Sequence, residues 1–405
     1  MPSPPPLRRF VDGITRNRWN LEGFTLADLD TALLALSVWH GPVGTRQLAQ
    51  PMLLRARELH QQRDTPESRQ TLAAALDDMG SVAQAEGDWR EAESLYRESL
   101  DIARALAKEL GTHEARRELA FSLDNVGTVA QTQGDWREAS RLSQESLSIR
   151  RAIAKELRTP EARRDLSVGI DYVAAVKRAQ GDWPAAGWLY GESLGIARAL
   201  DVLLGTPEAG RDLSVALDNV AAVKQAQGDW PAAGRLHRES LGVARALERL
   251  LGTPEAKRDL SVALDNVAAV KQAQGDWHEA DRLYKESLTM RRALEKAMRT
   301  LEARRDISVG LDNVAAVAEA RGNLSEADTL YRESLGIARA LGRVLGTPEA
   351  KRDLSVALDN VAAVKQAQGD WVEAGRLYQE GLGIARDLDR LLSRPCEFQF
   401  PATSV

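Results

Sequence analysis

An aspartate recurs every 47 residues through most of this sequence, and amide side chains accompany it at fixed spacings. An asparagine commonly follows it directly, and a glutamine commonly stands seven positions later. Helical periodicity places Asp265, Ala269 and Gln272 on one face of a helix. The candidate binding residues are Asp77, Asp124, Asp171, Asp218, Asp265, Asp312 and Asp359, with Asn125, Asn219, Asn266, Asn313 and Asn360, and with Gln225, Gln272 and Gln366. The aspartates could instead be solvated or paired with Lys224, Lys271 or Lys365.

Residues suited to catalysis or metal binding form no such pattern. The five histidines occupy different positions of the repeat, without the cysteines or spaced carboxylates of a metal site. His237 stands where other copies carry tyrosine, which favours a packing role. The single cysteine, Cys396, excludes an internal disulfide, and no glycine-rich phosphate loop is present. We therefore predict no catalytic residue, no metal site and no cofactor.

Composition narrows the function further. The 405 residues include 54 Lys and Arg against 59 Asp and Glu, a net charge of −5, which argues against a nucleic-acid-binding protein. No apolar run approaches the roughly 20 residues of a membrane span, and the start of the chain lacks a secretory leader. These features predict a soluble, cytoplasmic protein. The excess of arginine over lysine and the abundance of alanine favour a high-GC bacterial source.

The elements that position the aspartates are helix pairs. In the unit from Gly252 to Met298, Thr253-Pro254-Glu255 is a helix start, and apolar residues then follow with a 3.6-residue period. Gly275 ends the first helix, and Asp276 with Glu279 forms the capping box of the second. One such hairpin cannot bury its apolar stripe alone. We therefore predict an all-α solenoid of seven 47-residue hairpins, and we expect the tryptophan that opens each second helix to lie in the core.

The second helix of each unit resembles the tetratricopeptide repeat. The resemblance rests on Gly275-Asp276-Trp277, on Ala280 and Tyr284 four positions apart, and on Leu288. The alanine recurs in all seven units, at Ala92, Ala139, Ala186, Ala233, Ala280, Ala327 and Ala374. The unit is longer than the family's standard length of about 34 residues, in the manner of kinesin light chain, and it falls in the size range of HEAT-type repeats, the structural alternative.

The resemblance implies a right-handed superhelix and a concave groove lined by the first helices. In that setting the aspartates would bind Lys or Arg side chains, and the amides would meet a peptide backbone. The function so implied is a non-catalytic scaffold or adaptor for a peptide or protein partner with basic residues. The alternative is a regulatory or sensor arm that controls a separate ATPase or protease. Nucleic acid and membrane are not expected as partners.

The ends of the array differ from its middle. We predict a Pro-rich, basic and flexible segment over residues 1–23, a degenerate capping repeat over 24–63, the seven-repeat solenoid over 64–392, and a tail over 393–405. No polar capping helix follows the last hairpin, so that hairpin is expected to expose apolar surface. Self-association through this C-terminal end is therefore a further expectation.

Overall fold

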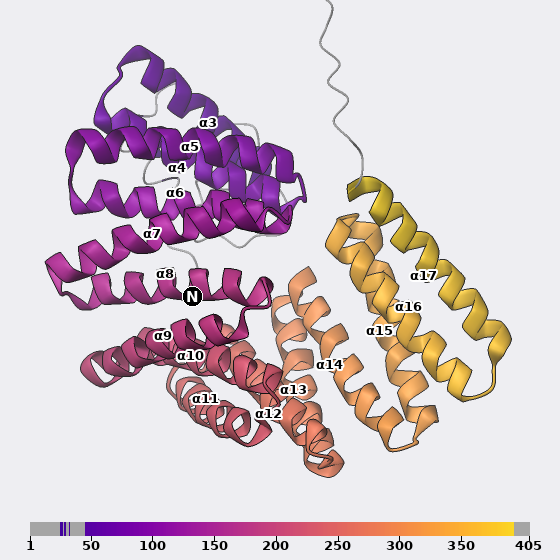
Figure 1. The fold of residues 1–405 in the computed structure, drawn as a ribbon. Coiled ribbons are helices and arrows are strands. Elements are labelled where there is room, and N and C mark those ends of the chain that lie inside the picture. The colour runs from indigo at the N-terminus through magenta and orange to yellow at the C-terminus, as the bar shows by residue number, and fades with distance from the viewer. Residues whose placement is uncertain (1–24, 27, 30–31, 33–44, 393–405) are drawn as a thin grey trace, which may run out of the picture. The chain divides into compact units, whose positions relative to one another are not determined.

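The computed structural model describes residues 25–26, 28–29, 32 and 45–392, and its ordered elements are all helices (Figure 1). They are α3 (Thr45–Gln62), α4 (Pro66–Ala85), α5 (Trp89–Leu110), α6 (His113–Thr132), α7 (Trp136–Leu157), α8 (Pro160–Ala179), α9 (Trp183–Leu204), α10 (Pro207–Ala226), α11 (Trp230–Leu251), α12 (Pro254–Ala273), α13 (Trp277–Met298), α14 (Leu301–Ala320), α15 (Leu324–Leu345), α16 (Pro348–Ala367) and α17 (Trp371–Leu392). No strand occurs in these segments. The helices pair in sequence as seven hairpins, α4/α5 to α16/α17. The predicted all-α solenoid of seven repeats is confirmed.

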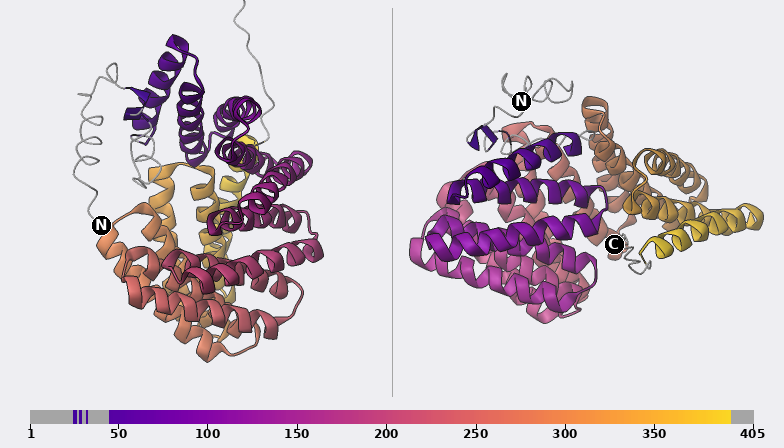
Figure 2. Two further views of the ribbon diagram at one scale, coloured as in Figure 1. Left: turned by 90° about the vertical axis from the view of Figure 1, so that its left-hand side faces the viewer. Right: turned by 90° about the horizontal axis from the view of Figure 1, so that it is seen from above.

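The chain divides into two compact units, Met1–Val243 and Ala244–Val405. Helices α3 to α10 and the first part of α11 belong to the first unit, and the rest of α11 with α12 to α17 belongs to the second. Within each unit, consecutive helices pack on one another, and the further views show the same succession of hairpins (Figure 2). The segments 1–23 and 393–405, with Cys396, lie outside the described residues, as does most of the stretch before α3.

Local sequence fixes where the helices begin and end. The Thr253 side chain accepts a hydrogen bond from the third residue of α12, and Pro254 opens that helix. The carboxylate of Asp276 accepts a hydrogen bond from the Glu279 N–H at 3.3 Å and so caps α13. Gly275 between the two helices has a φ of +78°, a conformation that glycine adopts without steric cost. Repetition of these signals sets the hairpin length.

Among the helix ends that the structure describes, two second helices end without the glycine that four others use. Gly111, Gly205 and Gly346 cap their helices in the left-handed region, whereas Arg158 and Arg299 occupy the same place with φ values of 57° and 54°. A side chain in this region costs free energy relative to glycine. The second and fifth repeats, which carry these arginines, also differ from the others at the candidate site described below.

The core of each hairpin is a column of fully buried aliphatic side chains on the first helix. Its members are Leu76, Leu123, Ile170, Leu217, Leu264, Leu311 and Leu358, each 0% exposed. The alanines of the family motif, which lie on the second helices, are also buried. The tryptophans are less buried than expected: Trp89 and Trp183 pack only at the edge of a core, and Trp136 and Trp371 are exposed. A tryptophan at the first position of a helix lies at the hairpin turn, where few side chains can cover it.

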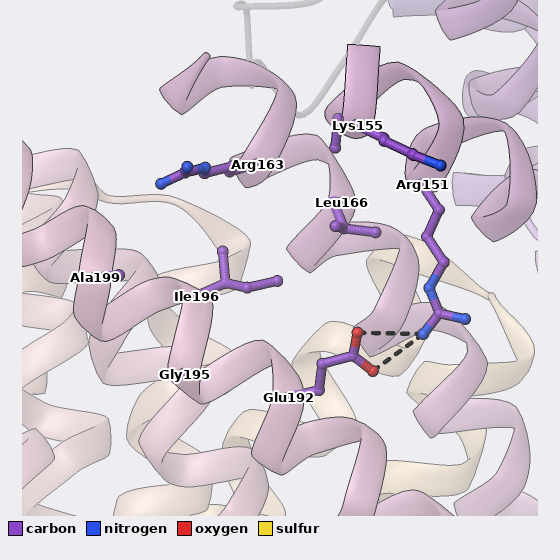
Figure 3. A pocket seen from close by; sticks show the side chains of 9 residues that line it. Arg151, Lys155, Arg163, Leu166, Glu192, Gly195, Ile196 and Ala199 are labelled. Atoms are coloured by element: carbon purple, nitrogen blue, oxygen red, sulfur yellow. Dashed lines mark hydrogen bonds and ion pairs between the residues drawn. The ribbon is translucent and has the colours of Figure 1, made fainter. Parts of the chain in front are cut away.

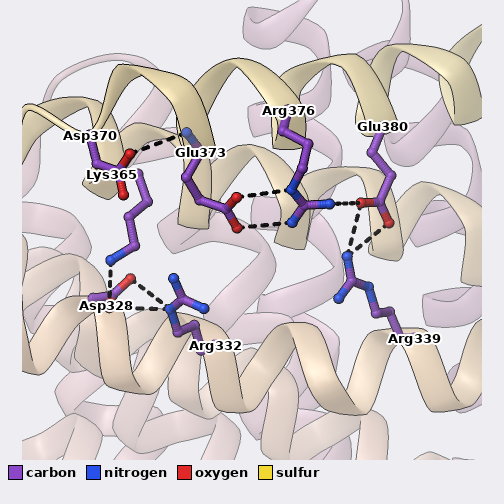
Figure 4. A network of polar contacts seen from close by, with 8 residues as sticks. All are labelled: Asp328, Arg332, Arg339, Lys365, Asp370, Glu373, Arg376 and Glu380. Atoms are coloured by element: carbon purple, nitrogen blue, oxygen red, sulfur yellow. Dashed lines mark hydrogen bonds and ion pairs between the residues drawn. The ribbon is translucent and has the colours of Figure 1, made fainter.

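Ion pairs connect neighbouring second helices at a constant separation of 41 residues. The pairs are Arg57–Glu98, Arg104–Glu145, Arg151–Glu192, Arg198–Glu239, Arg245–Glu286, Arg292–Glu333 and Arg339–Glu380. Figure 4 shows the last of them, in which the Glu380 carboxylate also accepts from Arg376 of its own helix. Exposed pairs of this kind contribute about 0–1 kcal/mol each to the stability of the fold. Their regular spacing matters more for the register between neighbouring repeats than for stability.

Candidate functional site

The recurring aspartates point toward the second helix of their own hairpin rather than straight into solvent. Asp124 is buried, Asp359 is exposed, and Asp77, Asp171, Asp218, Asp265 and Asp312 are partly buried. A fully buried serine of the second helix faces the carboxylate in several repeats, as Ser99 faces Asp77 and Ser193 faces Asp171. In the last repeat that serine is replaced by Gly381.

In the second and fifth repeats a buried arginine neutralises the aspartate. The Arg150 guanidinium donates to Asp124 Oδ2 at 2.5 Å, and that of Arg291 donates to Asp265 Oδ2 at 2.6 Å. Only 7% and 5% of these arginines are exposed. Desolvation raises the pKa of both carboxyl groups, and the arginine charge lowers it in part. The other repeats carry alanine where these two carry arginine.

The asparagines join adjacent first helices instead of standing free. Asn125 donates to Asp77 Oδ1 of the preceding repeat, and Asn313 donates to Asp265 Oδ2, both at 3.2 Å. Tyr172, which replaces the asparagine in the third repeat, donates its hydroxyl to the Asp124 carbonyl at 2.7 Å. The remaining candidates, Asn219, Asn266 and Asn360, are partly buried at the same position of their helices. This part of the predicted site therefore also connects repeats.

The glutamines meet the tyrosines of their own hairpin. Gln272 accepts a hydrogen bond from Tyr284 at 3.2 Å, and Gln366 accepts one from Tyr378 at 3.3 Å. In the fourth repeat, which holds Gln225, the tyrosine is replaced by His237. The buried His237 ring contacts Asp218 through Nδ1 at 2.7 Å, in agreement with the predicted packing role.

The lysines that could have paired with the aspartates have other partners. Lys271 binds Asp276 at 3.0 Å, Lys365 binds Asp328 at 2.9 Å, and Lys224 contacts Gln227. The alternative in which these lysines neutralise the aspartate row therefore has no support among the contacts of the described residues. The aspartates meet serine and asparagine, in two repeats arginine, and in the fourth repeat His237.

The aspartates without an arginine predict a pH dependence of stability. Burial and the nearby charge of Asp212 raise the pKa of Asp171 to about 6, although Ser193 lowers it in part. The ordinary aspartate pKa of about 3.9 applies to the unfolded chain. Between these two values the folded state holds a proton that the unfolded state has lost, so stability falls as pH rises from about 4 to above 6.

The Asp171→Asn variant removes this titration, so we expect it to be more stable than the wild type at pH 8, by about 1–2 kcal/mol. Near pH 4 the two proteins should have similar stability. Urea unfolding across this pH range measures the difference. Asp101→Asn, a substitution on the exposed side of α5, controls for the loss of one carboxylate. Equal stability of the wild type and Asp171→Asn at pH 8 would contradict the prediction.

An exposed apolar stripe accompanies the aspartates and was not predicted. Three positions before the aspartate, six first helices expose about half of an apolar side chain: Phe121, Val168, Val215, Val262, Val309 and Val356, between 44% and 53%. Together with the residue after the aspartate, which is asparagine in five of these repeats and Tyr172 in the third, these side chains lie on one helix face, which we call the first-helix face. The repetition of an apolar residue at this position was visible in the sequence, but no role was predicted for it.

A second surface feature lies among α7, α8 and α9. A cavity of about 490 Å³ has an apolar wall formed by Leu166 and Ile196, and Lys155 and Arg163 add basic side chains to it. Figure 3 shows Arg151 donating to the Glu192 carboxylate at its side. Beside it, Val202 at the end of α9 is 87% exposed. This cavity has no counterpart in the sequence prediction.

Other sites of chemistry are not found in the described part of the chain. It contains no group of three or more histidine, cysteine, aspartate or glutamate side chains arranged to hold a metal ion. None of its helices combines the length and apolar character that a membrane span requires.

Comparison with known proteins agrees with this architecture. The family model for the tetratricopeptide repeat matches residues 71–152 and 212–293. No curated protein matches the sequence. Among solved structures, BtubC (BKLC) from P. vanneervenii is similar with a TM-score of 0.50 and 17% identity, over 67% of this chain and 97% of that one.

Two further structures have the same kind of fold. The apo form of RapI has a TM-score of 0.50 and 11% identity, over 78% of this chain and 99% of its own. A signal transduction ATPase with numerous domains from Pyrococcus horikoshii, which has a tetratricopeptide repeat sensor, has a TM-score of 0.51 and 13% identity. That match covers 96% of this chain and 54% of the other. At these identities the likeness establishes the fold.

Proposed function

Since the chain is a tetratricopeptide-repeat protein, we propose that it is a non-catalytic, cytoplasmic scaffold or adaptor that binds a peptide or protein partner along its first helices. The observation that carries this proposal is the exposed apolar stripe of the first-helix face. Single exposed apolar residues are ordinary on protein surfaces, but an apolar residue recurs at this place in three successive repeats of the first unit and in three successive repeats of the second, so each unit carries its own line of contact. The candidate aspartates and amides lie beside it.

The roles within the proposed site differ from those first assigned. The partner's backbone and apolar side chains would meet the first-helix face, including its asparagines. Most of the aspartates would act from beneath that face, because serines, asparagines and arginines already contact them. The near-neutral charge of the chain fits a protein partner better than a nucleic acid. A bacterial source remains part of the proposal.

The test replaces the stripe in the first unit. We expect the triple variant Phe121→Ser, Val168→Ser, Val215→Ser to lose at least ten-fold in affinity for the native partner, because burial of these side chains on binding would contribute most of the apolar contact. The three positions are exposed, so helicity and thermal stability should change little. Affinity capture from the source cell identifies the partner, and titration of that partner measures the loss.

A matched control substitutes exposed residues elsewhere on the same unit. The variant Val202→Ser, Leu203→Ser changes side chains at the end of α9 that are at least as exposed, and it should bind the partner like the wild type. Equal binding by the stripe variant and the wild type would refute the proposed surface. Loss of binding by the α9 variant alone would place the partner at the end of α9, where Val202 and Leu203 lie with Arg163 and Arg198.

The second candidate function is a regulatory or sensor arm that acts on a separate ATPase or protease. It is supported by the near full-length match of this chain to part of an ATPase with a tetratricopeptide repeat sensor. The same capture experiment separates the two functions. Recovery of an ATPase or protease whose activity changes on addition of this chain would favour the sensor arm, and recovery of a non-enzymatic partner would favour the scaffold.

Self-association through the C-terminal hairpin is a separate proposal. The leucine at this position is buried in the six earlier repeats, as in Leu335, but Leu382 of α17 is 50% exposed, and Trp371 and Val372 on the same helix are also exposed. We expect the molecular mass in solution to rise with concentration, and the Leu382→Asp variant to stay monomeric, as measured by sedimentation. A wild-type chain that is monomeric at every concentration would rule the proposal out.

A further inference from the structure

A cavity of about 280 Å³ lies between α4, α5 and α6 in the first repeat. Buried and partly buried residues form its walls, and exposed residues form its rim. The walls include Ala73, Asp77, Ala103, Leu106 and Ser122, and the rim includes Gln70, Ala74, Glu114 and Glu118. Three of these side chains are acidic and none is basic. The volume lies just below the roughly 300–1,000 Å³ of a small-molecule pocket, so it suits one long side chain.

The corresponding space in the second repeat is occupied by an arginine of the chain itself. Arg150 stands 47 residues after Ala103. Its guanidinium donates to Asp124 Oδ2 at 2.5 Å and, through Nη1, to the Asp165 carbonyl of the next first helix at 3.1 Å. The next first helix has Gly169 beside it, where a Cβ would lie 2.7 Å from the arginine Cδ.

The fifth repeat repeats this arrangement. Arg291 donates to Asp265 Oδ2 at 2.6 Å and to the Asp306 carbonyl at 2.9 Å, and Gly310 stands next to it. Two repeats therefore show how a guanidinium fills this space and which groups accept its hydrogen bonds. The acceptors are the recurring aspartate and a main-chain carbonyl one repeat further on.

The first repeat has the acceptors but lacks both arginines that serve them elsewhere. Asp77 and Glu118 correspond to Asp124 and Asp165, while Ala103 replaces the buried arginine. Gln70 of α4 corresponds to Arg117 of α6, which stands 47 residues later. Arg117 binds Asp165 of α8 at 2.6 Å, and glutamine cannot form the equivalent ion pair with Glu118. Asp77 and Glu118 are therefore left without an ion-pair partner from these two positions.

The electrostatics of the first repeat agree with this difference. Desolvation raises the pKa of Asp77 to about 7, with Glu118 and Asp78 raising it further and Ser99 and Asn125 lowering it. Burial also raises the pKa of Glu118, which Arg117 lowers in part. Glu118 stands at the exposed rim, so its shift counts for less than that of Asp77.

We propose that this cavity binds the guanidinium group of an arginine presented by a peptide or protein partner, with Asp77 as its principal acceptor. The inference rests on the proposed function and assigns the partner's chemistry at one repeat. The methylene stem of the arginine would lie along Ala73, Ala103 and Leu106. A planar guanidinium can donate to a carboxylate and a carbonyl at once, which the compact lysine ammonium cannot match at this spacing.

The bond between Asn125 and Asp77 leaves room for this ligand. In the fifth repeat Asp265 Oδ2 accepts hydrogen bonds from Asn313 at 3.2 Å and from Arg291 at 2.6 Å. The carboxylate of this site can therefore accept from the neighbouring asparagine and from a guanidinium together. Glu114 and Glu118 at the rim add negative charge that attracts a cationic side chain before it enters.

The experiment uses the full chain and N-acetyl-L-arginine N-methylamide, titrated by ligand-observed NMR. The corresponding citrulline and lysine amides have a neutral head group and a compact ammonium, and both should bind at least ten-fold more weakly. The Ala103→Arg, Ser122→Gly variant copies the arginine and glycine of the second repeat. The new arginine side chain should fill the cavity, so the affinity for the arginine amide should fall at least ten-fold. Ala85→Arg, at the exposed end of α4, adds the same charge outside the lining and should bind like the wild type.

Asp77→Asn provides a second variant that needs no new packing, and it should also lose at least ten-fold in affinity. Equal binding of the arginine and citrulline amides would overturn the proposal, as would unchanged binding by both cavity variants. Tighter binding of free L-arginine than of the blocked amide would contradict a peptide ligand. Partner capture by the first-helix face is measured separately, so the proposed function can stand if the arginine site fails.

Discussion

Replacing Arg150 with alanine should destabilise the protein by about 3–5 kcal/mol, the loss typical of breaking a buried ion pair by removing one partner. The substitution leaves the carboxylate of Asp124 buried without its counter-charge, and it removes the side-chain donor that Arg150 supplies to the Asp165 carbonyl. It also opens a space beside Gly169, which has no side chain to fill it. Urea unfolding at pH 7, followed by circular dichroism, measures the loss.

The neighbouring residue supplies the control. Arg151 lies on the same helix and pairs with Glu192 at 3.0 Å, but 46% of its side chain is exposed. Arg151→Ala should therefore cost at most about 1 kcal/mol. A comparable loss of stability in Arg150→Ala and Arg151→Ala would show that the burial of Arg150 does not increase its contribution to stability.

A compensating variant makes the prediction more specific. The third repeat has Ala197 at the position of Arg150, and Ala216 of the next helix at the position of Gly169. Arg150→Ala, Gly169→Ala recreates that alanine pair, and adding Asp124→Asn removes the buried charge. We expect the triple variant to recover at least half of the lost stability. No recovery would indicate that the arginine acts by some route other than charge compensation and packing.

The helices were predictable because their signals are local and repeat seven times. A Thr-Pro-Glu start, a glycine turn and an aspartate cap act within a few residues, so one unit such as Gly252 to Met298 defined them all. The position of Trp371 was less predictable, since its burial depends on what covers the end of a hairpin. Local sequence carries no information about that.

The candidate site was predictable in its residues but not in their environment. Aspartate is seldom buried unless it is paired, and the groups that bury Asp124 come from the second helix and from the next repeat. The sequence did contain a signal: Arg150 is accompanied by Gly169 and Arg291 by Gly310, whereas the third repeat has alanine at both positions. That exchange predicts a contact between the two positions, and only the packed hairpins show that the aspartate is part of it.

Two residues of α12, Leu264 and Val262, allow the contribution of the buried core to stability to be compared with that of the exposed stripe. Leu264 is 0% exposed and belongs to the column that fills every hairpin, whereas Val262 on α12 is 44% exposed. Leu264→Ala should cost about 2–5 kcal/mol, since it removes apolar contacts and leaves a cavity. Val262→Ala should change stability by no more than about 0.5 kcal/mol.

A more specific test is where along the repeats the Leu264→Ala variant loses amide protection. In a repeat array each hairpin is stabilised mainly by its neighbours, so Leu264→Ala should lower amide protection most in α12 and α13 and least in the hairpin α16/α17. Hydrogen exchange with mass spectrometry resolves these segments. A uniform loss of protection across the second unit would mean that the unit unfolds as one cooperative block, and the additive model of its hairpins would then fail.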